Sequence, residues 1–145
     1  MEIYTIGFTR KSAEEFFGKL KDAGIRQLLD IRLNNTSQLA AFAKQDDLRY
    51  FLKQICKIDY LHMPILAPTQ EILDDFKKRK GDWDVYETGF NKLMVDRGIE
   101  TTLKKQLFKK RSVLLCSECE PDFCHRRLVA EYLKHHWGNV DIKHL

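Results

Sequence analysis

The sequence contains no apolar run long enough to span a bilayer, and its start shows neither a charged leader nor an apolar h-region with a small-residue cleavage site. It also lacks an internal repeat, a low-complexity tract and an interdomain linker. A membrane protein, a secreted protein and a repeat array are therefore not expected. We expect a cytoplasmic protein without a membrane partner.

A strong charge of either sign is missing as well. The formal net charge is +4, because 25 Lys and Arg residues are nearly balanced by 21 Asp and Glu residues. This balance favours solubility and allows weak attraction to anions, but it does not establish a nucleic-acid partner. Two basic regions, at 77–80 and at 104–111, are better explained as solvated helix ends than as nucleic-acid surfaces.

Cysteine is scarce, with four residues in the chain. Without a secretion signal, four cysteines are more typical of free thiols with a catalytic or metal-binding use than of a disulfide framework.

The sequence does have enough apolar material for one core, since 43% of its 145 residues are hydrophobic and 11% are aromatic. Short β-branched and aromatic runs alternate with helical patterns, which predicts an α/β fold. We expect a single domain over residues 1–145, with a mainly parallel sheet of about four to five strands and helices on both faces. This is a Rossmann-like three-layer arrangement, with a helical insertion between the third and fourth strands.

The expected strands are 2–6, 26–32, a weaker one at 58–62, 112–117 and 140–144. The expected helices are one that starts after Ser12 and ends at Gly24, 48–55, one after Thr69, 86–96, 100–109 and 124–137. Ser12 opens the motif Ser-Ala-Glu-Glu, which is typical of a capping box, and Thr69 is a second expected N-cap. A polar loop is expected in 33–44, before the apolar residues 39–42.

Polar residues follow three of the predicted strands. They are Gly7 and Thr9 after the first, Asp30 and Arg32 at the end of the second, and Cys116 and Glu118 at the end of the fourth. The carboxyl ends of parallel strands share one edge of the sheet, and ligands bind in the crevice there. We therefore expect these residues to converge on one site.

The start of the last predicted helix adds Cys124, His125 and Arg126. Free amides and the helix dipole favour an anion or a thiolate at such a position. A thiolate at Cys124 with His125 beside it has the ingredients of a nucleophile.

Structural explanations remain open for each of these residues. Cys116 could be a small buried hydrophobe, and Cys124 could pack beneath the helix. His125 could cap or pack locally. Asp30 and Arg32 could form an ion pair that supports the loop after their strand.

A metal site is an alternative, since Cys116, Cys119, Cys124 and His125 fall within ten positions and are ligands that zinc accepts. The spacing is not that of a standard paired knuckle, and adjacent ligands at 124 and 125 are awkward for one tetrahedral ion. The phosphatase pattern Cys-x5-Arg fails, because His125 and Ala130 occupy the required Arg positions. The haem pattern Cys-x-x-Cys-His fails at Glu120.

The chain resembles the domain of unknown function 488 family of small bacterial and archaeal proteins over nearly its whole length. The resemblance rests on Thr5-Ile6-Gly7, Leu29-Asp30-Ile31-Arg32, Cys116-Ser117-Glu118 and Cys124-His125-Arg126. Phe8 stands where the family commonly has His, and Cys119 lies outside the family pattern. The resemblance implies a site made of Cys116, Glu118, Cys124, His125, Arg126, Asp30 and Arg32, and it implies no reaction.

We expect an enzyme-like cleft in which Arg32, Arg126 and the last helix's N-terminus hold an anion, such as a phosphate of a small molecule, a nucleotide or a nucleic acid. Cys124 would be the thiolate or a ligand and His125 an acid/base or orienting group, with Glu118 and Asp30 orienting the arginines. No cofactor and no metal are assigned. The alternatives are a metal- or nucleic-acid-binding module without catalysis, and a purely structural polar network.

Overall fold

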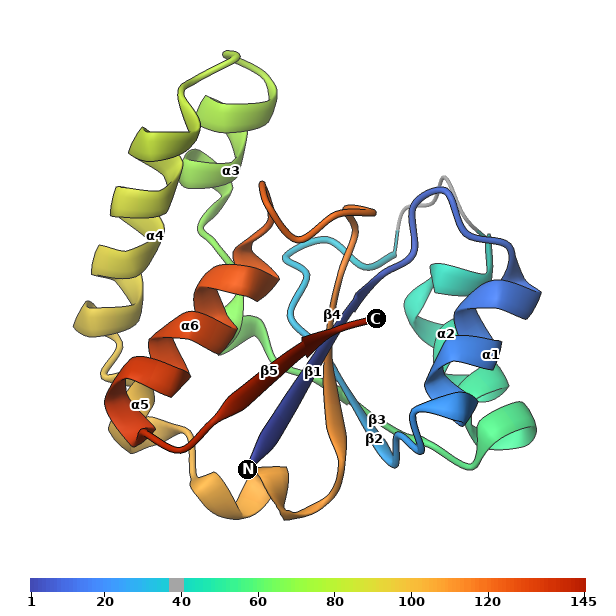
Figure 1. The fold of residues 1–145 in the computed structure, drawn as a ribbon. Coiled ribbons are helices and arrows are strands. Elements are labelled where there is room, and N and C mark those ends of the chain that lie inside the picture. The colour runs from blue at the N-terminus through green and yellow to red at the C-terminus, as the bar shows by residue number, and fades with distance from the viewer. Residues whose placement is uncertain (37–40) are drawn as a thin grey trace.

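The computed structural model describes residues 1–36 and 41–145. It contains a five-stranded parallel sheet in the order β3-β2-β4-β1-β5 (Figure 1). The strands are β1 (Glu2–Gly7), β2 (Gln27–Asp30), β3 (Asp59–His62), β4 (Ser112–Cys116) and β5 (Asp141–His144). The predicted single α/β domain with a Rossmann-like parallel sheet is confirmed.

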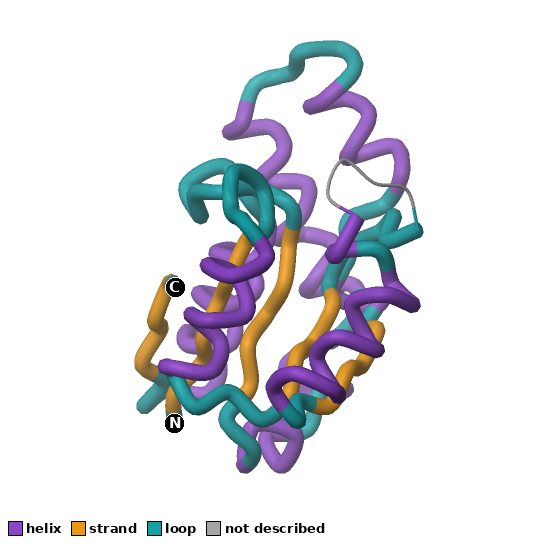
Figure 2. The backbone as a smooth tube through the Cα atoms, turned by 90° about the vertical axis from the view of Figure 1, so that its right-hand side faces the viewer, coloured by secondary structure: helices purple, strands orange, loops and turns teal. Residues whose placement is uncertain are grey.

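Helices cover both faces of this sheet, as two views at right angles show (Figures 1 and 2). One face carries α1 (Ala13–Asp22) and α2 (Gln45–Phe51), and the other carries α4 (Trp83–Asp96) and α6 (His125–Trp137). Alternate side chains of each strand enter opposite cores, because a strand turns successive side chains to opposite faces. In β4, for example, Leu114 joins the core under α4 and α6, whereas Leu115 joins the core under α1.

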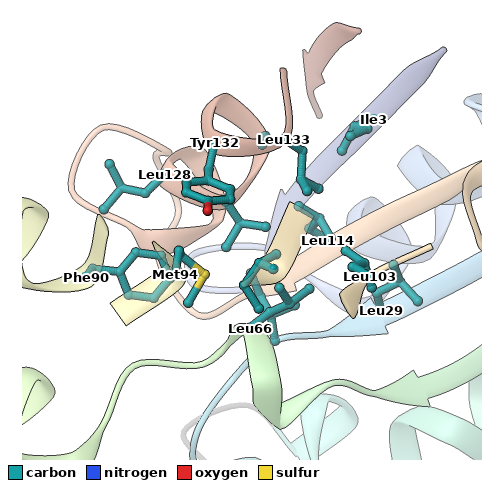
Figure 3. Close-up of a cluster of buried hydrophobic side chains, with 14 of the residues drawn as sticks. Ile3, Leu29, Leu66, Phe90, Met94, Leu103, Leu114, Leu128, Tyr132 and Leu133 are labelled. Carbon is teal, nitrogen blue, oxygen red and sulfur yellow. The ribbon is translucent and has the colours of Figure 1, made fainter. Parts of the chain in front are cut away.

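The core under α4 and α6 is the larger of the two clusters (Figure 3). Leu29 and Leu114 of the sheet meet Phe90 and Met94 of α4 there, and all four side chains are fully buried. Burying side chains of this size stabilises the fold by about 1.5–3 kcal/mol each. Leu128, Val129 and Leu133 of α6 belong to the same cluster, so this packing also holds the helix whose first residues carry the predicted site.

Two predicted helix starts have the expected caps. The Ser12 hydroxyl accepts a hydrogen bond from the Glu15 amide at 3.1 Å, at the start of α1. The Thr69 hydroxyl accepts one from the Ile72 amide at 3.2 Å, at the start of α3 (Gln70–Lys77). Both side chains satisfy an amide that the first turn of a helix leaves without a partner.

The predicted helix at 100–109 is wrong, because the chain forms two short pieces there. They are α5 (Ile99–Thr102) and a 3-10 helix over Lys105–Lys109. The break falls at Leu103, whose backbone is extended, and it lets both Leu103 and Phe108 enter the core beneath α6. The insertion of α3, α4 and α5 between β3 and β4 agrees with the prediction.

Other boundaries differ by a few residues. The helix expected at 86–96 begins earlier, at Trp83, with Asp82 as its N-cap. The helix expected at 48–55 begins at Gln45 and continues into a π-helical turn over Leu52–Cys56. In the expected loop, residues 37–40 lie outside the described residues. In the described ranges, 1–36 and 41–145, no helix is long and apolar enough to cross a bilayer.

The register of the sheet brings the predicted site together. Gly7 at the end of β1 is paired with Cys116 at the end of β4, and Asp30 at the end of β2 is paired with Leu115. The carboxyl ends of these three neighbouring strands therefore form one edge, onto which the loop between β4 and α6 folds.

Candidate active site

Two cysteines and a histidine lie together at this edge. Cys116 is the last residue of β4, Cys124 is the N-cap of α6 and His125 is its first residue. Their sulfur and nitrogen atoms all lie within 4.8 Å of one another, and all three side chains are buried. The adjacent positions 124 and 125 thus reach one point, although the sequence made this look awkward.

Each of the two ring nitrogens of His125 has a hydrogen-bond partner. Its Nε2 lies 2.7 Å from the carbonyl oxygen of Ile31, and its Nδ1 lies 3.4 Å from Sγ of Cys116. A carbonyl oxygen can only accept a hydrogen bond, so Nε2 carries a proton and Nδ1 is the nitrogen that exchanges a proton with the thiol. Phe90 packs against the ring, with the centroids 5.5 Å apart.

The two thiols have opposite electrostatic surroundings. Burial alone would raise the pKa of Cys116, but the Cys124 thiol, the charge of Arg126 and the amides of Ser117 and Glu118 outweigh burial and lower it. Burial raises the pKa of Cys124 well above its usual value, and the neighbouring Cys116 raises it further. These directions favour Cys116, rather than the expected Cys124, as the thiolate.

Arg126 supplies positive charge without facing a ligand. Its side chain is fully buried, and its guanidinium donates hydrogen bonds to the carbonyl oxygens of Glu118 and Cys119, the latter at 3.0 Å. Within the described part of the chain it forms no ion pair with a carboxylate, and its Nε has no hydrogen-bond partner. A buried charge without a carboxylate favours a negative charge nearby, and a Cys116 thiolate meets that need.

Gly7 and Thr9 also support the loop between β4 and α6. A Cβ atom on Gly7 would overlap the carbonyl oxygen of Glu118 and lie 2.7 Å from Nη1 of Arg126, so only glycine lets the loop pack this closely. The amide of Thr9 donates to the carbonyl oxygen of Ser117 at 3.0 Å, and its hydroxyl donates to the same oxygen at 2.6 Å.

Asp30 and Arg32 form the ion pair that the sequence left as one alternative. Nε and Nη2 of Arg32 each donate to the Asp30 carboxylate at 2.8 Å, and both side chains are buried. The Tyr60 hydroxyl and the Asn35 amide also donate to this carboxylate. Burial would raise the pKa of Asp30, but hydrogen bonds and charge from Arg32 outweigh burial and lower it.

A pocket of about 420 Å³ opens above the cysteines and the histidine. Its walls are mainly apolar and come from the loops after β1, β2 and β4 and from the inserted helices. Its polar lining includes Arg32 and the Lys77–Glu118 ion pair. The residues that line it include Phe8, Thr9, Arg32, Phe76, Lys77, Tyr86, Cys116, Glu118, Phe123, Cys124 and His125.

The predicted site residues fall into two groups. Those that line the pocket are Thr9, Arg32, Cys116, Glu118, Cys124 and His125. Gly7, Asp30 and Arg126 lie outside the lining and hold these residues in place. Glu118 pairs with Lys77 and does not orient an arginine through its carboxylate, whereas Asp30 does orient Arg32. Cys119 lies outside the cysteine–histidine cluster, as expected.

The sequence did not indicate that aromatic side chains form a wall of the pocket. They are Phe8, Phe76, Tyr86 and Phe123. Phe8 stacks near Arg32, with its ring centroid 5.3 Å from Cζ, and Trp83 contacts both Phe76 and Phe123. The aromatic residues of α3 and α4 carried a helical pattern, but no signal in the sequence showed that this insertion faces the strand ends. Lys77 lines the pocket, although it belongs to a basic run expected to be solvated. The next two residues, Lys78 and Arg79, pair with Asp74 and Asp75 of α3.

Comparison with known proteins gives a family and no closer relative. No curated protein and no solved structure matched the chain. The family described as Domain of unknown function DUF488 matches residues 12–133 of the 145 residues, and the chain belongs to that family.

Proposed function

We propose that the pocket is the active site of a cysteine-dependent enzyme that acts on an anionic substrate, such as a phosphate-containing small molecule, a nucleotide or a nucleic acid. Cys116 is the nucleophile and His125 is its acid/base partner. One observation carries this proposal: Nδ1 of His125 lies 3.4 Å from the Cys116 sulfur, while its Nε2 is held by the Ile31 carbonyl oxygen at 2.7 Å. A nucleophile, a base and a group that orients the base are the parts that covalent catalysis requires.

The surroundings suit the charges that this chemistry creates. Transfer of the thiol proton to Nδ1 leaves a thiolate beside an imidazolium, whose second N–H remains bonded to Ile31. The buried Arg126 charge and the amides of Ser117 and Glu118 favour the thiolate. Cys116 reaches the pocket while staying largely shielded from bulk water, which strengthens these interactions.

Arg32 is the proposed contact for the anion. Its Nε and Nη2 are taken by Asp30, whereas Nη1 has no hydrogen-bond partner among residues 1–36 and 41–145. The Asp30 pair fixes the plane of the guanidinium, so little side-chain entropy remains to be lost when Nη1 binds an oxyanion. Lys77 offers a second cation at the rim of the pocket.

Thiol alkylation tests the nucleophile. We expect iodoacetamide at pH 7 to label Cys116 faster than Cys56, which has a raised pKa and lies outside the pocket. Adenosine monophosphate, a phosphate-bearing probe, should slow this labelling in the native protein and fail to slow it in Arg32→Met. Equal labelling rates at Cys116 and Cys56 in the native protein would remove the basis of the proposal.

A metal-binding site is the second candidate, since the donor atoms of Cys116, Cys124 and His125 lie within 4.8 Å of one another. The hydrogen bond from Nε2 of His125 to the Ile31 carbonyl oxygen is compatible with this candidate. Histidines that bind a metal through one ring nitrogen usually donate a hydrogen bond from the other nitrogen to such a group. Three protein donors beside a pocket suit zinc with one open position. Stoichiometric zinc in protein purified without chelator, lost in Cys124→Ser, would favour this candidate over the free nucleophile.

A further inference from the structure

The proposed mechanism uses the Cys116 thiol and gives the buried Cys124 thiol no role. Cys124 lines the same pocket as Cys116, is 2% exposed, and has its sulfur within 4.8 Å of the Cys116 sulfur. A nucleophile for acyl or phosphoryl transfer needs no second thiol beside it. We propose that Cys116 and Cys124 are also a redox pair, which a hydroperoxide converts into a disulfide across the floor of the pocket and a small thiol reduces again.

The positions of the two residues allow the bond to form. A disulfide needs sulfur atoms about 2.05 Å apart, so the side chains must rotate toward each other from their present separation. Cys116 is the last residue of β4 and Cys124 is the N-cap of α6, so both lie at the ends of regular elements. The Cys124 side chain makes no capping hydrogen bond to α6, and its rotation therefore leaves the start of the helix intact.

The two thiols are also suited to different steps. Cys116 lies against the imidazole of His125 and near the charge of Arg126, so it is the sulfur that attacks. Cys124 is the more deeply buried of the two, at 2% against 6% exposure, and its sulfur lies within 4.8 Å of the Cys116 sulfur, so it is placed to be the second sulfur of the pair. A sulfenic acid on Cys116 therefore has a second thiol close to it, and this thiol resolves the sulfenic acid as a disulfide once it has given its proton to Nδ1 of His125.

The reaction balances with hydrogen peroxide as the oxidant. The Cys116 thiolate forms a bond to one peroxide oxygen, the O–O bond breaks, and the leaving hydroxide takes the proton from His125 to become water. Cys116 is then a sulfenic acid. The Cys124 sulfur attacks the Cys116 sulfur, the S–O bond breaks, and the leaving hydroxide takes the thiol proton of Cys124, by way of Nδ1 of His125. In total, two thiols and one peroxide give one disulfide and two waters. In the reverse direction, one small thiol attacks the protein disulfide and releases one cysteine thiol, and a second small thiol attacks the mixed disulfide, which releases the other cysteine thiol and a small-molecule disulfide.

Peroxide titration of the reduced protein tests this inference. After one equivalent of hydrogen peroxide and blocking with N-ethylmaleimide, two of the four thiols should be protected, and peptide mapping should join Cys116 to Cys124. Dithiothreitol should restore all four thiols. Cys56→Ser and Cys119→Ser are matched controls and should form the same disulfide.

Two further variants separate the steps. Cys124→Ser should stop at a Cys116 sulfenic acid that dimedone traps, and Cys116→Ser should protect no thiol. If the native protein instead accumulates dimedone-reactive Cys116 with no disulfide, or pairs Cys116 with Cys119, the inference is overturned. Rapid alkylation of Cys116 in a protein that forms no disulfide would overturn the redox pair and leave the proposed nucleophile standing.

Discussion

The carbonyl oxygen of Ile31 and Nε2 of His125 lie 2.7 Å apart, and this hydrogen bond joins the loop after β2 to the first residue of α6 across 94 positions of sequence. It decides which imidazole nitrogen faces Cys116. In the proposed mechanism, the reactivity of the Cys116 thiol is therefore set partly by a backbone carbonyl in the loop after a neighbouring strand.

The first prediction concerns His125→Asn. Loss of Nδ1 removes the proton acceptor of Cys116, so alkylation of Cys116 at pH 7 should slow by about tenfold or more, the effect of at least one pKa unit. Mass-spectrometric rates of iodoacetamide labelling measure this. His135→Asn changes an exposed histidine on the same helix and should leave the rate unchanged. An undiminished rate in His125→Asn would show that the imidazole does not act on the thiol.

The second prediction concerns Arg126. In Arg126→Met the pH midpoint of Cys116 labelling should rise, because the buried positive charge is lost. In Arg126→Lys the midpoint should stay nearer the native value, while both variants lose stability because the Glu118 and Cys119 carbonyl oxygens lose their paired donors. Each unsatisfied carbonyl costs about 1–3 kcal/mol. If the pH midpoint of Cys116 labelling were the same in Arg126→Met and Arg126→Lys, the charge of Arg126 would not be what lowers the pKa of Cys116.

Gly7→Ala is the third prediction. The added methyl group overlaps the Glu118 carbonyl oxygen, so the free energy of unfolding should fall by about 1–3 kcal/mol, as overpacking does. Gly18→Ala is the matched control, since a Cβ there meets nothing within 4 Å, and it should stabilise α1 by about 0.5–1 kcal/mol. Urea unfolding compares the two. Equal stability of Gly7→Ala and the native protein would contradict the close contact.

The fourth prediction concerns Asp30→Asn, which leaves Arg32 buried without its partner and should cost about 3–5 kcal/mol. The pKa of Asp30 is lowered by folding, so this stability is present above the unfolded pKa of about 3.9 and is lost as pH falls through the lower folded value. The difference between native and variant proteins should therefore be constant near neutral pH and shrink in acid. Asp96→Asn, which breaks an exposed pair with Lys92, should cost about 1 kcal/mol or less.

The sequence predicted the sheet and the edge at which the site lies, because apolar runs mark buried strands and parallel strands share their carboxyl edge. Asp30, Cys116 and Cys124 reached that edge as expected. The proposed exchange of roles between Cys116 and Cys124 could not be foreseen, since it depends on the Ser117 and Glu118 amides and on the buried Arg126 charge. Arg126 was expected to bind a ligand, yet the loop folds over its guanidinium and takes the donors that the sequence assigned to an anion.

The helix α3 has no fully buried residue, and it contributes Leu73, Phe76 and Lys77 to the pocket. The reacting groups belong instead to the sheet edge and to α6. Substitutions of the α3 residues that line the pocket can therefore alter which ligands bind, while the proposed reacting groups and the buried core stay unchanged. Related chains could acquire different substrates by changing the residues of α3 that line the pocket, such as Leu73 and Lys77, and chimeras that exchange α3 would reveal how far one set of reacting groups serves several ligands.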